Sequence, residues 1–118
     1  MKNIHLLGWG SLIWDQGSLK TLNKWKTTDF TLPLEFSRIS SDNRLTLVID
    51  NNGKNNNVFH KQLDYTDINS AINNIAIREK TNPKNIAYIN LVHNKMRLCG
   101  LSYKYVITII NWMKKNKI

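Results

Sequence analysis

The segment from Phe36 to Gly53, FSRISSDNRLTLVIDNNG, contains the clearest structural signal in the chain. Apolar and polar residues alternate from Phe36 to Ser40, which is typical of a strand with one buried face. Ser41, Asp42 and Asn43 are turn-forming residues, and the β-prone run Leu45–Ile49 follows them before Asp50–Gly53 ends it. We therefore predict an antiparallel β-hairpin here, and a sheet built from neighbouring strands.

The segments on either side of this hairpin predict more strands and two helices. Pro33 confines its strand to a sheet edge or a strand start, because proline cannot donate to a ladder. From Thr66 the apolar spacing becomes helical, with Thr66 or Asp67 as N-cap, and Asn82-Pro83 ends the helix. The run Val106–Ile110 also fits a strand, but an apolar stripe followed by lysines favours a helix. The predicted strands are Ile4–Leu7, Phe30–Phe36, Val58–Leu63 and Ile86–Val92, and the predicted helices are 67–80 and 105–117.

The length of 118 residues predicts a single domain, 1–118. The order of strand, hairpin, helix and strand indicates the α+β class, because an alternating parallel sheet would need more helices. The single cysteine, Cys99, excludes an intramolecular disulfide, and we expect it to be a small buried residue in a reducing compartment. No stretch approaches the roughly 20 apolar residues of a membrane span, so we expect no membrane partner and a cytoplasmic protein.

The net charge of +9 raises the question of a nucleic-acid partner. The 17 asparagines, with many lysines and isoleucines, suggest the residue drift of an AT-rich coding sequence. The positive charge is spread thinly except at Lys114, Lys115 and Lys117, and Trp25 is the one aromatic residue set between lysines in a way that fits base stacking. We therefore expect no nucleic-acid partner, and we expect Trp25 to be a hydrophobic anchor.

Glu79 occupies an unusual position for a carboxylate. It follows Ile68, Ile72 and Ile75 at spacings of four, three and four, so it lies only about 20° around the helix axis from Ile68. Glu79 is then a solvated charge at a frayed helix end, or a partner to Arg78 or Lys80, or it faces the interior or a cleft as a general acid and base. Glu35, the second glutamate of the chain, is a weaker candidate because its neighbours place it on the polar side of a strand.

The loop Gly8-Trp9-Gly10-Ser11-Leu12 follows a buried strand. Glycines in such a turn allow successive backbone N–H groups to face an anion. The loop lacks the Gly-Lys-Ser/Thr of a P-loop and the third glycine of a dinucleotide fingerprint. Spacing alone leaves a tight structural turn and a binding loop equally open.

Three segments together resemble the gamma-glutamylcyclotransferase-like proteins. GWGSLIWDQG, from Gly8 to Gly17, is similar to the Tyr-Gly-Ser-Leu-Ile-Trp-x-Pro-Gly opening of that family, especially its glutathione-specific branch. NRLTLVID, from Asn43 to Asp50, resembles the strand that follows, and AIREK, from Ala76 to Lys80, resembles the segment with the catalytic glutamate. The resemblance covers about residues 4–92 and implies an α+β fold, a small mixed β-barrel or curved sheet with helices packed outside.

The resemblance also implies a chemistry. In this family the α-amino group of a γ-glutamyl amide or peptide, such as glutathione, attacks its own side-chain carbonyl, giving 5-oxoproline and a free amine. The implied catalytic residue is Glu79, and the implied substrate-binding residues are Trp9, Gly10, Ser11 and Leu12, with the loop amides holding a carboxylate and the oxyanion. No cofactor and no metal are implied, and we expect the separate His5, His60 and His93 to be structural or surface residues.

The chain departs from the family pattern in three ways. Trp9 replaces the motif tyrosine and Gln16 the proline, and the chain is shorter at its C-terminal end than the relatives, so we expect a shortened member. The alternative function is a non-catalytic module of the same fold that binds a small anion or a protein. The sequence defines neither the γ-glutamyl compound nor the oligomeric state.

Overall fold

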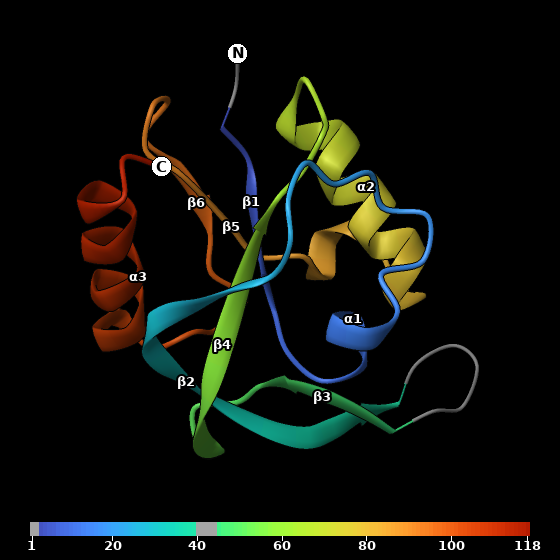
Figure 1. Cartoon of the computed structure of the whole chain (residues 1–118). Coiled ribbons are helices and arrows are strands. Elements are labelled where there is room, and N and C mark those ends of the chain that lie inside the picture. The colour runs from blue at the N-terminus through green and yellow to red at the C-terminus, as the bar shows by residue number, and fades with distance from the viewer. Residues whose placement is uncertain (1–2, 40–44) are drawn as a thin grey trace.

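The computed structural model describes residues 3–39 and 45–118. Four strands form one curled sheet, two more form a separate hairpin, and helices lie on both sides of the main sheet (Figure 1). In chain order the elements are β1 (His5–Gly8), α1 (Ser11–Trp14), β2 (Lys26–Ile39), β3 (Leu45–Ile49), β4 (Lys54–Gln62), α2 (Ile68–Glu79), the 3₁₀ helix η1 (Pro83–Asn85), β5 (Tyr88–Asn90), β6 (Lys95–Arg97) and α3 (Tyr103–Lys115).

The main sheet has the strand order β1-β4-β2-β3, and its described strand pairs are all antiparallel. The α+β class and the curved sheet are therefore confirmed. The hairpin of β2 and β3 is also confirmed, whereas its expected turn at residues 41–43 lies outside the described residues.

Irregular pairing bends the longest strand of the sheet. The register of β2 shifts between Thr27 and Thr31 against β4, and between Phe36 and Arg38 against β3. At the first shift, the Thr28 hydroxyl lies 3.0 and 2.9 Å from the carbonyl oxygens of Phe30 and Val58, which share its one hydrogen. Such irregularities increase the local twist, which accounts for the curl.

Pro33 lies in a central strand, so its expected place at a sheet edge or strand start is wrong. The reason is local, because β3 ends at Ile49 and Pro33 faces Asp50, the next residue. The Pro33 carbonyl accepts from the Asp50 amide at 3.0 Å, and the nitrogen of a strand residue points to the same side as its carbonyl. The missing N–H therefore falls past the end of the β3 ladder.

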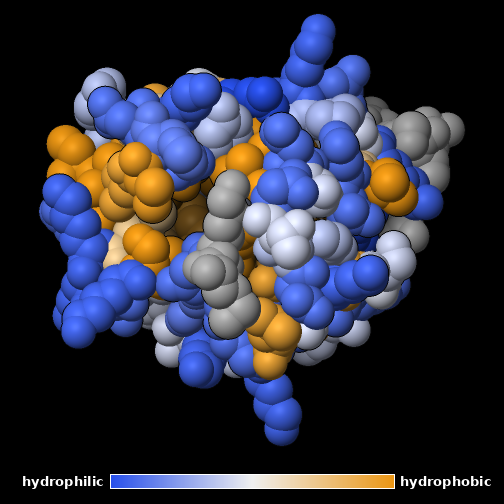
Figure 2. All heavy atoms as spheres, turned by 90° about the horizontal axis from the view of Figure 1, so that it is seen from above, coloured by the Kyte–Doolittle hydropathy of each residue, from blue (hydrophilic) through white to orange (hydrophobic). Residues whose placement is uncertain are grey.

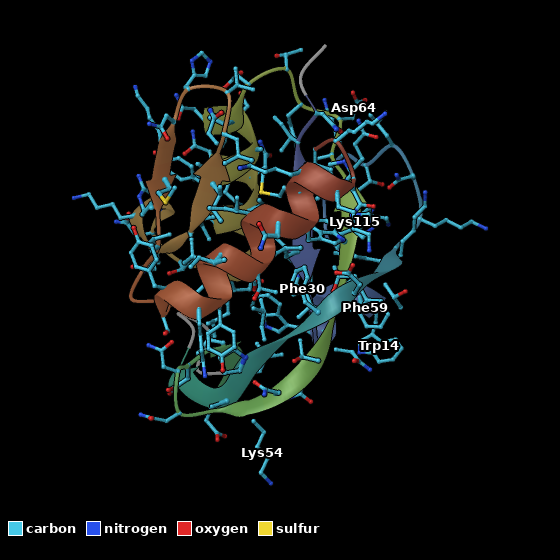
Figure 3. All side chains as sticks on the ribbon, turned by 90° about the vertical axis from the view of Figure 1, so that its left-hand side faces the viewer. Trp14, Phe30, Lys54, Phe59, Asp64 and Lys115 are labelled. Carbon is cyan, nitrogen blue, oxygen red and sulfur yellow. The ribbon has the colours of Figure 1, made fainter. Side chains whose placement is uncertain are left out.

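The helix expected over residues 105–117 is confirmed as α3, two residues earlier at Tyr103–Lys115, and it covers one face of the sheet. Figure 3 shows this helix in front of the main sheet and beside β2, with Phe30 between the two. The Phe30 and Trp112 rings meet edge to face, with centroids 5.5 Å apart. The buried cluster between the helix and the sheet consists of Phe30, Leu32, Leu34, Val58, Ile109 and Trp112.

The helix α2 lies on the other side of the sheet from α3 (Figure 1). Its N-cap is Asp67, one of the two predicted residues, whose carboxylate accepts from the Ser70 amide at 2.8 Å. The helix ends at Glu79, and Lys80 adopts the left-handed conformation at φ 52°. Ala71, Ile72 and Ala76 form its buried face.

The predicted strand Ile86–Val92 is wrong in extent, because only Tyr88–Asn90 of this range form a strand and a turn leads directly into β6. Asn94 adopts a left-handed φ of 52°, and the Asn90 side chain accepts from the His93 amide at 3.2 Å. Because Leu91 and Val92 are apolar, the sequence carries no turn signal at these two positions. Val92 and Met96 are exposed, and seen from above apolar side chains gather on the side where β5, β6 and α3 lie (Figure 2).

Cys99 is exposed rather than buried, because it lies in the loop between β6 and α3 at φ 51°. Within the part of the chain that the structure describes, no helix is both long enough and apolar enough to cross a bilayer.

Candidate active site

The opening loop turns sharply between β1 and the short helix α1. Gly10 has φ 61° and ψ −140°, a backbone conformation that residues with a Cβ rarely adopt. The first bond of the new turn joins the Ile13 amide to the Gly10 carbonyl at 3.2 Å. The amides of Ser11 and Leu12 precede that bond and have no partner within the helix. The Leu12 side chain is buried and Ser11 is exposed, so Leu12 can reach a ligand only through its backbone.

Gly8, the first glycine of the motif, is required by packing. A Cβ at this position would clash with the Trp25 ring, because it would come closer than real Cβ atoms approach other atoms. Trp25 therefore packs against the backbone of β1, and the expectation of a hydrophobic anchor is confirmed. Trp9 also has a packing role, because its partly buried ring lies against the core cluster beneath α3.

Glu79 is the last residue of α2, and its neighbour Arg78 pairs with it. The Arg78 Nη1 donates to Glu79 Oε2 at 3.2 Å, and 15% of the Arg78 side chain and 27% of the Glu79 side chain are exposed. Among the expectations for Glu79, the structure shows the pairing with Arg78. It also shows a helix that remains ordered through Glu79 and a carboxylate that is largely shielded from water.

Arg78 also contacts the opening loop. Its Nη2 donates to Ser11 Oγ at 3.2 Å, and its Nε donates to the Asp15 carbonyl at 2.8 Å. Because Ser11 Oγ and Glu79 Oε2 bind to one planar guanidinium, they lie within about 9 Å of each other. Sequence reasoning considered Arg78 only as an ion-pair partner, because the spacing of the helix did not show that its side chain reaches α1.

Gln16, which stands where the family motif has proline, binds a buried lysine. The Lys61 ammonium on β4 donates to Gln16 Oε1 at 2.6 Å and lies 5.3 Å from the centre of the Trp25 ring. Lys61 is only 9% exposed, so the amide oxygen and the aromatic face replace water around its charge. The departure from the motif thus has a packing explanation in this chain.

Two of the three histidines form a pair that the sequence did not indicate. The Nδ1 atoms of His5 and His60 are 3.2 Å apart. Burial, His60 and Lys26 lower the pKa of His5 from 6.5 to about 4, and burial and Lys26 lower the pKa of His60. His93 is a surface residue. Among residues 3–39 and 45–118, no three potential metal-ligating side chains come together.

Two shallow hollows lie away from the Glu79 site. One, of about 220 Å³, is next to the Cys99 loop, and the other, of about 270 Å³, lies between β2 and α3. Glu35 is exposed on β2, in agreement with its predicted place on the polar side of a strand.

Comparisons of this chain with protein-family models, with curated proteins and with solved structures gave no match. The candidate site therefore rests on the geometry of its own residues.

Proposed function

We propose that the protein is a γ-glutamylcyclotransferase-like enzyme, of the lyase or acyltransferase type, that converts a γ-glutamyl amide or peptide such as glutathione to 5-oxoproline and a free amine. The observation that carries this proposal is the position of Arg78, which joins Glu79 to Ser11 through one guanidinium group. An acid–base residue and a loop with available amides then lie on the same side of the molecule.

The reaction requires little beyond orientation and proton transfer. The α-amino nitrogen of the γ-glutamyl group attacks the side-chain carbonyl of the same group, and the amide bond to the leaving amine breaks. Glu79 takes the proton that the attacking nitrogen loses and delivers a proton to the departing amine, so no water is consumed. Ring closure forms five members, which makes the attack intramolecular.

The opening loop supplies the anion-binding groups. The amides of Gly10, Ser11 and Leu12 hold the substrate α-carboxylate and the developing oxyanion. Arg78 keeps the Glu79 carboxylate oriented toward this loop, and its charge favours an anionic substrate there. Trp9 anchors the loop, because its ring packs against the core cluster.

The first test measures 5-oxoproline release from glutathione and from a panel of γ-glutamyl dipeptides. We expect the wild-type protein to release it, and we expect Glu79→Gln to remain folded and lose at least about 100-fold in kcat, the usual contribution of a general acid–base group. Glu35→Gln is the matched control, because it removes an exposed carboxylate from the same chain, and it should keep wild-type turnover. Equal activity of the wild type and Glu79→Gln would reject Glu79 as the base.

A second candidate is a non-catalytic module that binds small anions at the same loop. The ion pair of Glu79 with Arg78 favours this alternative, because it occupies one carboxylate oxygen of the proposed base. Isothermal titration with glutathione separates the two candidates. Binding without 5-oxoproline release by the wild-type protein would support the module, whereas binding with turnover supports the enzyme.

A further inference from the structure

The helix α3 carries a narrow apolar stripe on its outer surface, in addition to the face that packs on the sheet. Tyr103, Ile107 and Ile110 follow one another at spacings of four and three residues, so they lie within about 60° around the helix axis. The exposed fractions of Tyr103 and Ile107 are 71% and 51%, and Ile110 is half-buried. We call these three residues the α3 stripe.

The α3 stripe faces away from β2. Thr108 lines the hollow between α3 and β2, and it lies about 100–160° around the helix axis from the three residues of the stripe. The β5–β6 hairpin lies on the other side of α3 from β2 (Figure 3). Val92 and Met96 are exposed on this hairpin, so the segment beside the helix also presents apolar surface.

The acidic residues are distributed unevenly along the chain. All eight lie between Asp15 and Glu79, so the segment 80–118, which forms η1, β5, β6 and α3, contains eight lysines and arginines and no acidic side chain. Lys104 and Lys114 are exposed near the two ends of the α3 stripe. The stripe is therefore bounded by positive charge at both ends.

A carboxylate from β2 reaches α3 on the flank toward that strand. Asp29 pairs with Lys115 at 3.1 Å, and both residues line the hollow between β2 and α3. Lys115 lies about 80–140° around the axis from the α3 stripe. This ion pair therefore compensates the charge of Lys115 and leaves Lys104 and Lys114 facing solvent beside the stripe.

Apolar side chains within a positively charged surface restrict the kind of partner. A second copy of the chain would bring two surfaces of like charge together, which electrostatic repulsion opposes. A nucleic acid would bind the lysines through its phosphates and leave Tyr103 and Ile107 without an apolar partner. A helix that binds lipid turns its main apolar face to the membrane, and in α3 that face, with Ile109 and Trp112, is buried on the sheet.

We propose that the outer face of α3 is a docking surface for an acidic amphipathic helix of another protein. Apolar residues of the partner pack along the α3 stripe, and carboxylates beside them meet Lys104 and Lys114. The helix α2, which ends at Glu79, lies on the other side of the sheet (Figure 1). Docking at α3 is therefore independent of the proposed enzymatic reaction.

A labelled synthetic peptide of about 15 residues, long enough for four helical turns, is the probe. It has leucine at positions i, i+4, i+7 and i+11 and glutamate at the positions beside them. We expect it to bind the whole chain in a fluorescence anisotropy titration, with an affinity that falls as salt increases. A second peptide with serine in place of each leucine keeps the charge, and it should bind at least about 10-fold more weakly.

Two pairs of variants locate the binding. Ile107→Ser removes the centre of the α3 stripe and should weaken binding of the leucine peptide at least about 5-fold, whereas Ile77→Ser, which changes an exposed isoleucine of α2, should leave it unchanged. Lys114→Glu should weaken binding by a similar factor. Its control Lys20→Glu makes the same change of charge at an exposed lysine before β2, and it should change the affinity by less than about 2-fold.

The proposal is overturned if the wild-type chain does not bind the leucine peptide, if both peptides bind equally, or if Ile107→Ser and Ile77→Ser have equal effects. Two further results would assign the surface to a different partner and would also reject the proposal. One is a dimer in sedimentation of the chain alone that Ile107→Ser abolishes. The other is binding to phosphatidylserine vesicles or to an oligonucleotide that is tighter than binding to the leucine peptide and depends on Ile107.

Discussion

The two glycines at the start of the opening loop meet different requirements, although they look alike in the sequence. Gly10 is needed for its backbone conformation, at φ 61°, and Gly8 is needed because Trp25 occupies the space of a side chain. The sharp turn that presents the loop amides therefore depends on Gly10, whereas Gly8 is needed for the packing of β1.

We expect Gly8→Ala to lower the free energy of unfolding by about 1–3 kcal/mol, because its Cβ would overpack against the Trp25 ring. Denaturant unfolding measures this change. In a Trp25→Leu background the ring is absent, so the same substitution should cost less, and an equal cost in both backgrounds would contradict the packing explanation.

At the scale of elements, α2 is the segment whose sequence and structure agree most closely. Its helical period was predicted, its N-cap Asp67 was one of two predicted candidates, and Ile72 of the predicted apolar stripe is buried, because these signals are local to about four residues. The β5–β6 hairpin was missed because its turn contains apolar residues, and the position of Pro33 was wrong because it depends on where a neighbouring strand ends.

The two ends of α2 predict stability changes of opposite sign. Asp67→Ala removes the cap on Ser70 and should lower the free energy of unfolding by about 1 kcal/mol. Lys80→Gly should raise it by about 1 kcal/mol, because glycine adopts the left-handed conformation without strain. Lys80→Ala retains a Cβ and serves as the control, so thermal unfolding that shows equal gains for alanine and glycine would contradict this reason.

At the scale of the whole molecule, the charge of +9 is the feature most open to misinterpretation. Trp25, the aromatic residue best placed in the sequence for base stacking, packs against Gly8 and under Lys61. The Trp25 ring therefore cannot stack on a nucleic-acid base unless β1 and its neighbours rearrange.

We accordingly expect no binding of single- or double-stranded oligonucleotides at physiological ionic strength. A fluorescence titration across a salt series measures this. Affinity that persists at physiological salt and falls steeply as salt increases would show phosphate contacts and would contradict the prediction.

The sequence by itself determined the α+β class, the two long helices, the antiparallel hairpin and the candidate residues, because periodicity and caps depend on neighbours along the chain. Only the tertiary structure decided which distant residues meet. It joined Arg78 to Ser11 and Asp15, Lys61 to Gln16, and His5 to His60. Those contacts depend on how the curled sheet sets β1, β4 and α2 relative to one another, and no spacing along the chain encodes that arrangement directly.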